Sequence, residues 1–335
     1  MSQSEGPPSR TFGHRSVVVS DRNERPSFRP AATDPGEKLC RFDATDERIR
    51  GLVERFLDES AGDDRDNGLT IRLRLVEDDL CELPESLEEH WSGTPTRLTV
   101  RVGDHLETTI DVGNAVIDGW VSESLLDRLP ETAARLLLEA PLATARAGRG
   151  WQVVHAATVV GPSGAAVIRG ASGSGKSTLA AAAWKAGLEV LGDESVLVRQ
   201  PGHHALVASV REVLVRPETA EMLDLEGDRI VTNGGEPKLR LILHQIEAAR
   251  RSATHAATVF LGDRSQPGGA RSTPLSPEAF KAGFDDAAIP QERWYGSPKP
   301  LVDDWARRPA FRLDGAIDLD GAIALLRHLC HGETR

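Results

Sequence analysis

One segment, Gly170–Ser177, constrains this chain more than any other, because it reads Gly-Ala-Ser-Gly-Ser-Gly-Lys-Ser. It has the form G-x-x-x-x-G-K-[ST], in which a glycine-rich backbone and the N-terminus of the next helix turn several N–H groups toward a phosphate chain. The apolar run around Val167-Ile168 predicts a strand before this glycine-rich loop, and the Ala- and Leu-rich stretch Lys176–Lys185 predicts a helix after it. The order strand, loop, helix predicts an α/β fold that binds a nucleoside triphosphate.

The last two residues of the glycine-rich loop have separate expected roles. Lys176 adds a positive charge between the β- and γ-phosphates, and the Ser177 hydroxyl binds Mg²⁺, so ATP and Mg²⁺ are the expected cofactors. The alternative, a glycine-rich turn that happens to precede a helix, is disfavoured because the Lys-Ser pair stands in its required place. The residues expected to bind the nucleotide are Gly170, Ala171, Ser172, Gly173, Ser174, Gly175, Lys176, Ser177 and Thr178.

Composition argues against several other classes of protein. The 335 residues carry a net charge of −11, which argues against a general nucleic-acid binder, since phosphate backbones are held by clustered Lys and Arg. A basic peptide or a basic patch on a partner is compatible with this charge. No apolar run approaches the ~18 residues that span a bilayer, and the N-terminus lacks a secretory signal core, so we expect a cytoplasmic protein without membrane contact. Cys40, Cys81 and Cys330 are too few and too scattered for a disulfide framework or a zinc site.

The length predicts about two domains after an N-terminal leader. Residues 1–38 mix Ser, Pro, Arg and Asp without periodicity, which predicts a disordered leader. Residues 40–148 predict a smaller N-terminal α+β domain of unknown role, and residues 150–331 the catalytic domain. The elements expected in residues 40–148 are a helix over about 45–57, strands at 69–75, 98–102 and 106–112, and a helical stretch over about 123–147 interrupted near Pro130 and Pro141.

In residues 150–331 the glycine-rich loop is entered through a β-hairpin, whereas in an ordinary βαβ unit a helix precedes the strand. One strand is expected over Gln152–Val160, followed by a turn at Gly161–Gly164 and the strand that carries the loop. After the loop helix, the apolar run Leu188–Val198 is interrupted by polar residues at 192–195. Further elements are expected at 205–210 and 257–261 as strands, and at 319–331 as a final helix.

Asp193 and Glu194 are the candidates for chemistry beside the loop. They interrupt an apolar run at the C-terminal end of a strand, where open α/β sheets place their ligands. One carboxylate could take the proton of an attacking hydroxyl while the other holds metal. A polar turn between two shorter strands is the alternative. His155 stands alone in an apolar strand and, on sequence alone, is more typical of a core histidine.

Three motifs together resemble the catalytic domain of the HPr serine kinase family and its HPr-kinase-related relatives. They are His155-Ala156-Ala157, the glycine-rich loop and Leu191-Gly192-Asp193-Glu194. Their spacings also agree, with fifteen residues from His155 to Gly170 and seventeen from Lys176 to Asp193. The resemblance covers about residues 150–330 and is strong over 150–200.

The resemblance implies a P-loop kinase core of the HPr kinase and phosphoenolpyruvate-carboxykinase-like type. It implies the acidic pair Asp193 and Glu194 as metal partner and general base, with His155 as a helper near that base. The acidic pair of HPr kinases proper is Asp-Asp, whereas Glu194 stands at the second position here. Members of the family often form hexamers, which implies a homo-oligomer as one possible state.

The family's second signature stretch and its basic loop have no convincing copy in this chain. Arg211-Glu212 and Lys238-Leu239-Arg240 are the nearest substitutes. Glu212 is a candidate second metal ligand, and Lys238 or Arg240 could neutralise charge on the transferring phosphoryl group. Charges on surface strands explain these residues equally well, so phosphorylase activity is not assumed.

Two other features have ordinary explanations. Ala257–Asp263 resembles an apolar strand ending in an acid, the Walker B form of motor and transporter ATPases, but no Ser-Gly-Gly-Gln signature accompanies it. Because Gly-Asp is common turn chemistry, Asp263 is expected to be a turn residue. The tryptophans expected to pack in cores or under loops are Trp151, Trp184, Trp294 and Trp305.

The sequence therefore predicts a Mg-ATP-dependent kinase that transfers the γ-phosphoryl group to a hydroxyl, expected to be serine, of a peptide or small protein. One alternative is a kinase for free serine or a metabolite, which needs a closed pocket where a peptide kinase needs an open groove. Another is an ATP-binding regulator or ATPase in which residues 40–148 do the recognition. The acceptor and the choice of base between Asp193 and Glu194 stay open.

Overall fold

The chain folds into helices and mixed β-sheets, as the strand, loop and helix pattern predicts. The computed structural model describes residues 41–44, 46–59, 69–78, 83, 87–94, 96–199, 205–208, 212–231, 236–243, 252–289, 292 and 298–331. The predicted leader, Cys40, Cys81, Arg211 and Trp294 lie outside the described residues. In the described part of the chain, no helix combines the length and apolar character that crossing a membrane requires.

The N-terminal segment (residues 41–147) is built on a six-stranded sheet in the order β1-β2-β6-β5-β4-β3. Its strands are β1 (Arg41–Ala44), β2 (Thr70–Val76), β3 (Glu89–Thr94), β4 (Arg97–Val102), β5 (Leu106–Asp111) and β6 (Val116–Ser122). Strands β1, β2 and β6 run parallel, and β3 to β6 form an antiparallel meander. Along β4, Leu98, Val100 and Val102 are buried while Arg97 and Arg101 are exposed, which is the alternation that predicts this strand.

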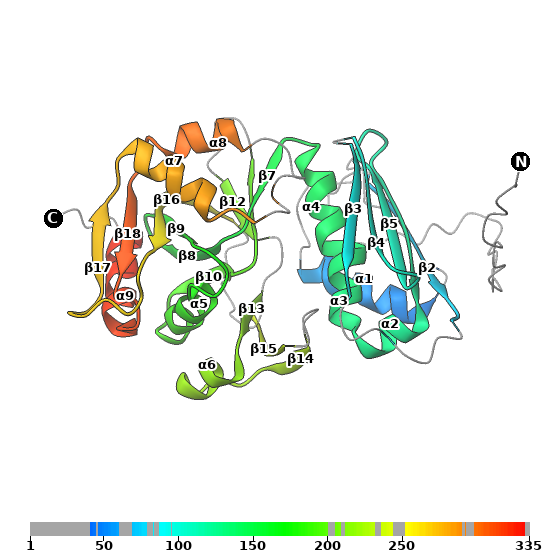
Figure 1. The fold of residues 1–335 in the computed structure, drawn as a ribbon, viewed down its shortest axis with the longest axis horizontal. Coiled ribbons are helices and arrows are strands. Elements are labelled where there is room, and N and C mark those ends of the chain that lie inside the picture. Colours follow the sequence, from blue (N-terminus) through cyan, green and yellow to red (C-terminus); the bar gives the residue numbers. More distant parts are fainter. Residues whose placement is uncertain are drawn as a thin grey trace, which may run out of the picture.

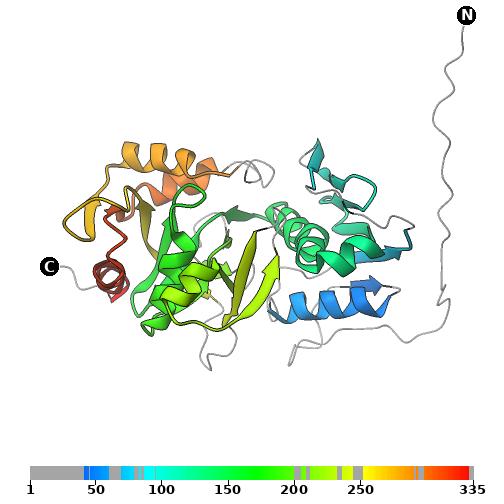
Figure 2. The ribbon, with the colours of Figure 1, turned by 60° about the horizontal axis from the view of Figure 1, so that its bottom comes forward.

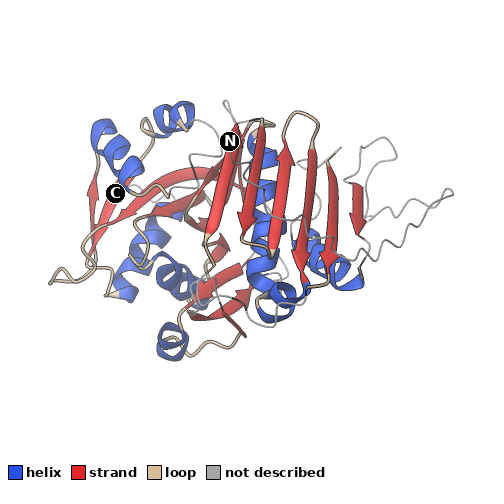
Figure 3. Ribbon diagram, turned by 45° about the vertical axis from the view of Figure 1, so that its right-hand side comes forward, coloured by secondary structure: helices blue, strands red, loops and turns tan. Residues whose placement is uncertain are grey.

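The helices of the N-terminal segment cover one face of this sheet (Figure 3). They are α1 (Glu47–Glu59), α2 (Glu123–Arg128), α3 (Pro130–Ala134), a π-helical turn (Arg135–Glu139) and α4 (Ala140–Ala147). Pro130 begins α3, which confirms the predicted interruption there. At Pro141 the prediction is wrong, because the helix continues. Ala140 donates its N–H to the carbonyl of Arg135, five residues back, and this wider turn accommodates a proline that has no N–H of its own.

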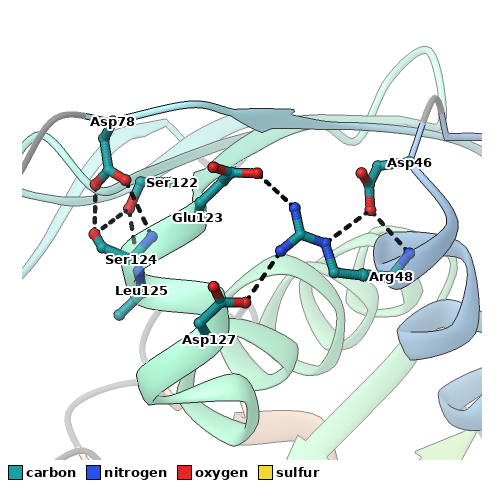
Figure 4. A network of polar contacts seen from close by, with 8 residues as sticks. All are labelled: Asp46, Arg48, Asp78, Ser122, Glu123, Ser124, Leu125 and Asp127. Carbon is teal, nitrogen blue, oxygen red and sulfur yellow. Dashed lines mark hydrogen bonds and ion pairs between the residues drawn. The ribbon is translucent and has the colours of Figure 1, made fainter.

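Arg48 joins α1 to α2 (Figure 4). Its guanidinium donates to Glu123 at 2.6 Å and to Asp127 at 3.1 Å, and it lies 3.4 Å from Asp46. These side chains are all partly exposed to solvent, so the contacts contribute little to the free energy of folding. Their main effect is to orient the two helices relative to each other.

Asp78, which follows β2, holds the N-terminus of α2 (Figure 4). It accepts the Ser124 N–H at 3.1 Å and also the Ser124 hydroxyl, while Ser122 caps the helix by accepting the Leu125 N–H at 3.2 Å. Burial alone would raise the pKa of Asp78, but hydrogen bonds from Ser124 and Ser122 and the nearby His105 together lower it. The sheet, α1 and α2 are thus joined by ionised as well as apolar contacts.

The C-terminal segment (residues 151–331) is built on a nine-stranded mixed sheet. Its central order is β10-β8-β9-β16-β12-β11-β7, with β18 beside β16 and β17 beside β18. The strands are β7 (Trp151–Val154), β8 (Ala157–Gly161), β9 (Gly164–Arg169), β10 (Glu189–Gly192), β11 (Val196–Arg199), β12 (Ala205–Ala208), β16 (Ser252–Leu261), β17 (Arg271–Pro274) and β18 (Ala310–Asp314). Every residue of β8 and β9 is buried, as expected for strands that are covered on both faces.

Two pairs of helices cover the opposite faces of β8, β9 and β16 (Figure 1). One pair is α5 (Lys176–Lys185) and α9 (Leu319–His331), which pack on Val159, Ile168 and Val259. The other pair is α7 (Pro277–Asp286) and α8 (Lys299–Trp305). Both α5 and α9 have the boundaries that the sequence predicts, since each carries a sustained apolar pattern.

The predicted hairpin is confirmed, and the strand predicted before it is wrong. Strands β8 and β9 are antiparallel with Gly161 opposite Gly164. The single strand predicted over Gln152–Val160 is two strands, because β7 pairs with β11 whereas β8 pairs with β9 and β10. His155 and Ala156 carry the chain from one part of the sheet to the other. A continuous apolar run shows burial, but it cannot show a change of strand partner.

A small three-stranded sheet lies between α5 and the helices of the N-terminal segment (Figures 1 and 2). It consists of β13 (Glu212–Val215), β15 (Pro237–Ile242) and β14 (Asp228–Val231), with α6 (Pro217–Met222) after β13. Arg240 of β15 is 9% exposed and donates to Glu131 of α3 at 2.7 Å and to Asp228 at 3.1 Å. This ion pair joins the two segments, together with an apolar cluster in which Ala143 of α4 packs with β7.

Glu131→Gln is expected to lower the free energy of unfolding by about 1–2 kcal/mol, because a mostly buried guanidinium loses one of its charged acceptors. Glu236→Gln is the control, since the Arg216–Glu236 pair spans 3.8 Å between well-exposed side chains. Urea denaturation of both variants measures the difference. Equal stability of the two variants would show that the Arg240–Glu131 ion pair does not stabilise the fold.

Candidate active site

The glycine-rich loop connects β9 to α5 and adopts a backbone that glycine allows. Gly173 and Gly175 have φ values of +77° and +102°, in the left-handed region that L side chains rarely adopt. A Cβ on Gly170 would lie 2.7 Å from the Ser174 hydroxyl oxygen, so the loop also closes tightly on itself. Ala171, Ser172 and Gly173 are exposed, and α5 begins at Lys176. The loop therefore presents an open backbone surface at the start of a ten-residue helix.

Lys176 is folded into this loop. Its Nζ donates to the carbonyls of Gly170 at 2.9 Å and Ala171 at 3.2 Å, and the residue is only 6% exposed. Burial lowers the pKa of Lys176, while the carboxylates of Glu194 and Asp193 oppose that shift. The ammonium thus sits between the mouth of the loop and the acidic pair. Thr178, two residues after Lys176, turns its side chain toward α6, and its hydroxyl oxygen lies 3.3 Å from the hydroxyl oxygen of Thr219.

Asp193 lies at the centre of the site. It is 1% exposed and accepts the Leu214 N–H at 3.3 Å on each oxygen, and the nearby Ser177 hydroxyl acts to lower its pKa. Burial, and then the neighbouring Glu194, raise the pKa of Asp193 to about 8, although Ser177, Leu214 and Lys238 all favour its ionised form. A carboxyl group in such a place stays protonated near neutral pH, and a cation beside it would favour the carboxylate.

Glu194 and His155 lie on the open side of Asp193. The Glu194 side chain is 37% exposed, and its Oε2 lies 3.9 Å from Nδ1 of His155. Burial lowers the pKa of His155 despite the opposing charge of Glu194, which favours a neutral imidazole near pH 7. His155 is thus part of this site, and the alternative of an isolated core histidine does not describe its position.

A buried ion pair that the sequence did not point to supports this arrangement. Arg169, the last residue of β9, is fully buried and donates to both oxygens of Glu292 at 3.0 and 3.2 Å. Glu292 also accepts the His155 N–H at 2.6 Å, and Arg169 donates to the Phe284 carbonyl at 3.1 Å. The pair therefore fixes the chain next to Gly170 and the crossing at His155 at once. An arginine ending a buried strand is a sequence signal for such a pair, whereas nothing around Glu292 marks it.

The N-terminal segment also contributes a carboxyl group near this site. Glu139 ends the π-helical turn and is partly buried. Burial, and then the charge of Glu194, raise the pKa of Glu139 to about 7, against the opposing effect of Arg135 and Arg146. Residues 40–148 show no catalytic motif, so sequence reasoning missed this side chain. π-Helical turns are frequent at functional sites, but a π turn has no sequence signature of its own.

The basic candidates of the small sheet have different surroundings. Lys238 is partly exposed, and its charge lowers the pKa of Asp193, so it faces the site. Arg240 is bound to Glu131 and Asp228, which corrects the expectation that it could neutralise a transferring phosphoryl group. Burial alone would lower the pKa of Arg240. The carboxylates of Glu131, Asp228 and Glu212 outweigh this effect and raise the pKa. Glu212 begins β13, two residues before Leu214, and its role as a metal ligand stays a prediction.

The chemistry of the site fits a magnesium nucleotide. Open glycine-rich backbone and Lys176 suit phosphate oxygens, and the Ser177 hydroxyl and Asp193 carboxyl are the hard oxygen ligands that Mg²⁺ takes. Among the described residues, no three His, Cys, Asp or Glu side chains gather as a metal-holding group. Mg²⁺ is usually bound through one or two carboxylates, water and substrate phosphates. The buried Ser174 hydroxyl oxygen has no hydrogen-bond partner among the described residues.

The remaining candidates have structural roles. Asp263 is exposed and accepts the N–H of Ser265 at 3.0 Å and its hydroxyl at 2.7 Å, which is the expected turn geometry. Trp151 and Trp305 are buried, and the partly buried Trp184 of α5 packs against the core, as expected.

Comparisons with known proteins add little. A scan against protein-family models finds no match, and a search of curated proteins finds none either. Among solved structures, the HPr(Ser) kinase/phosphatase from Coxiella burnetii is a weak structural neighbour, with 14% sequence identity and a TM-score of 0.28. The match covers 53% of this chain and 95% of that chain. A likeness this weak carries no argument about fold, so function has to be inferred from the site itself.

Glu292→Gln is expected to lower the free energy of unfolding by about 3 kcal/mol, because Arg169 keeps its buried charge and loses its counter-ion. Asp303→Asn is the control, since the Lys281–Asp303 pair is exposed and its loss is expected to leave stability essentially unchanged. Chemical denaturation at neutral pH compares the two. A Glu292→Gln protein as stable as the wild type would contradict a supporting role for the ion pair.

Proposed function

We propose that this protein is a Mg-ATP-dependent kinase of the HPr-kinase-like type, transferring the γ-phosphoryl group to a hydroxyl, in the first place serine, of a peptide or small protein. The observation that carries the proposal is the buried Asp193 carboxyl, held by the Leu214 N–H and near the Ser177 hydroxyl and Lys176 of the glycine-rich loop. A hydroxyl and a carboxyl at a loop that suits phosphates form a Mg²⁺–phosphate site, and Glu194 beside it supplies a base.

The contacts of each residue indicate its role in the proposed mechanism. Lys176 and the loop N–H groups hold the phosphate chain, and Ser177 and Asp193 hold Mg²⁺, with Glu212 as a further candidate ligand. When bound, ATP would supply the phosphoryl group that is transferred, and Mg²⁺ would neutralise part of the negative charge on the phosphates. Asp193 is enclosed by Ser177 and Leu214, so it has little freedom to meet an acceptor.

Glu194 is therefore the better candidate for the base. Its partly exposed carboxylate can approach an incoming hydroxyl, and Nδ1 of His155 lies 3.9 Å from it. Glu194 accepts the proton of the acceptor hydroxyl as that oxygen bonds to the γ-phosphorus and the bond to the leaving ADP oxygen breaks. His155 orients the Glu194 carboxylate without needing a charge of its own. Of the two acids that the sequence leaves open, the proposal therefore assigns the role of base to Glu194.

In this proposal residues 150–331 form the catalytic domain of a cytoplasmic enzyme, residues 40–148 a smaller domain that reaches the site through Glu139, and residues 1–38 a leader. Assembly into a homo-oligomer belongs to the proposal as well, by resemblance to the HPr kinase family. Glu139 and Glu194 also favour an acceptor that carries a positive charge. A small alcohol with an amino group, such as free serine, is therefore the second candidate acceptor, next to a basic peptide.

Lys176→Ala is expected to reduce phosphoryl transfer by about a hundredfold or more, since charge stabilisation at the phosphates is lost. Lys185→Ala is the control, because Lys185 lies at the other end of α5 and contacts Leu223 and Asp224. Radiolabelled ATP would be incubated with each protein and with peptides, with amino alcohols or with water alone. Full transfer by Lys176→Ala would refute the proposed site, and phosphate release to water alone would favour an ATPase.

Glu194→Gln and Asp193→Asn are expected to fail in different ways. Without its base, Glu194→Gln should lose about a hundredfold or more in kcat while its affinity for Mg-ATP stays near that of the wild type. Asp193→Asn should need a much higher Mg²⁺ concentration for half-maximal activity. Steady-state kinetics over ATP and Mg²⁺ concentrations separate the two. If Asp193→Asn alone lost kcat and Glu194→Gln kept it, the two roles would have to be exchanged.

A further inference from the structure

A second basic side chain lies beside the glycine-rich loop, from a part of the chain that the proposed mechanism does not use. Strand β16 is the parallel neighbour of β9, with Phe260 opposite Arg169, so the residues after Leu261 leave the sheet at the same edge as Gly170. A Cβ placed on Gly175 would lie 3.8 Å from a terminal guanidinium nitrogen, Nη1, of Arg264. The chain after β16 therefore brings a cation to the last glycine of the loop.

The backbone around Arg264 is held firmly. The Arg264 carbonyl accepts the Ile317 N–H at 3.1 Å, and the Asp263 carbonyl accepts the Gly315 N–H at 2.8 Å. The Asp263 N–H in turn donates to Asp314 at 2.8 Å. These bonds fasten the turn to the connection between β18 and α9, so the position of Arg264 is set by the fold.

The Arg264 side chain, in contrast, is not paired with an acid in the described part of the chain. It is exposed, and its guanidinium makes no hydrogen bond or ion pair with the described residues, whereas the neighbouring Arg312 is bound to Asp314 at 2.9 Å. A guanidinium offers several N–H donors in one plane and matches phosphate oxygens two at a time. A positive group beside backbone N–H donors at a helix N-terminus is complementary to an anion.

The order of strands indicates which part of that anion Arg264 meets. In the order β10-β8-β9-β16, the strand that leads into Asp193 lies on one side of β9 and the strand that leads into Arg264 lies on the other. A phosphate chain lying over the glycine-rich loop has its transferred end with Ser177, Asp193 and Glu194. Arg264 therefore faces the end of the chain that stays with the nucleoside.

We propose that Arg264 is a nucleotide-binding residue that contacts the non-transferred α- and β-phosphates from the β16 side of the loop. The inference rests on the proposed function, because it assigns a contact to the nucleotide that the kinase would use. It also predicts that Arg264 increases the affinity for ATP and the affinity for ADP by the same factor. The residue would thus determine affinity for the nucleotide rather than the rate of transfer.

The variant Arg264→Ala tests this proposal. Wild type and variant would each be titrated with Mg-ATP and with Mg-ADP, and binding would be measured by isothermal titration calorimetry. We expect both dissociation constants to rise by about tenfold, as for a lost charged hydrogen bond at an open site, with kcat at saturating ATP nearly unchanged. Arg264→Lys should recover only part of the affinity, because an ammonium cannot bind two oxygens in one plane. Arg271→Ala is the matched control, since exposed Arg271 approaches Gly268 instead of the glycine-rich loop.

Each of the other outcomes overturns a stated part of the proposal. Unchanged affinity of Arg264→Ala for both nucleotides, with normal binding by the wild type, overturns the role of Arg264. A loss confined to ATP overturns its assignment to the non-transferred phosphates. Wild-type protein that binds neither nucleotide refutes the proposed function and this inference together. The thermal unfolding midpoint of Arg264→Ala should match that of the wild type, because the side chain is exposed.

Discussion

The buried pair of Arg169 and Glu292 is the interaction on which the arrangement of the candidate site depends. A guanidinium that is fully removed from water is costly unless its charge and N–H groups are satisfied, and here two carboxylate oxygens and the Phe284 carbonyl satisfy most of them. The Phe284 ring lies 3.9 Å from the guanidinium and adds a cation–π contact. Because Glu292 also holds the His155 N–H, one ion pair fixes three separate parts of the chain.

This geometry separates the charges of the site into two groups. Asp193, Glu194 and Glu139 form the acidic side, and burial with mutual repulsion raises the pKa of Asp193 and Glu139 toward or above neutrality. Lys176 lies between this side and the loop, and Arg264 lies beyond the loop. Repulsion within an acidic group is relieved by a cation, and an unpaired guanidinium is neutralised by an anion. The proposed magnesium nucleotide would provide both a cation and an anion at once.

Sequence patterns predicted the parts of the fold that depend on local chemistry. Helices α5 and α9, the β8–β9 hairpin and the interruption at Asp193 follow from apolar periodicity, turn residues and glycine. The strand expected across His155 was wrong because the change of partner strand depends on Glu292, which is 137 residues away in sequence. The small sheet, Glu139 and Arg264 were missed for a related reason, since they matter through contacts between distant segments. The roles of the predicted site residues stay predictions.

The contacts between the two segments suggest how residues 41–147 could matter for chemistry without carrying a motif. Arg240 binds Glu131 of the N-terminal segment, and it stands opposite Leu214 in the small sheet. Leu214 in turn donates its N–H to Asp193. A displacement of the N-terminal segment would therefore move the strand that holds Asp193, while Glu139 would move relative to Glu194. Strands β15 and β13 therefore connect Glu131 of the N-terminal segment to Asp193.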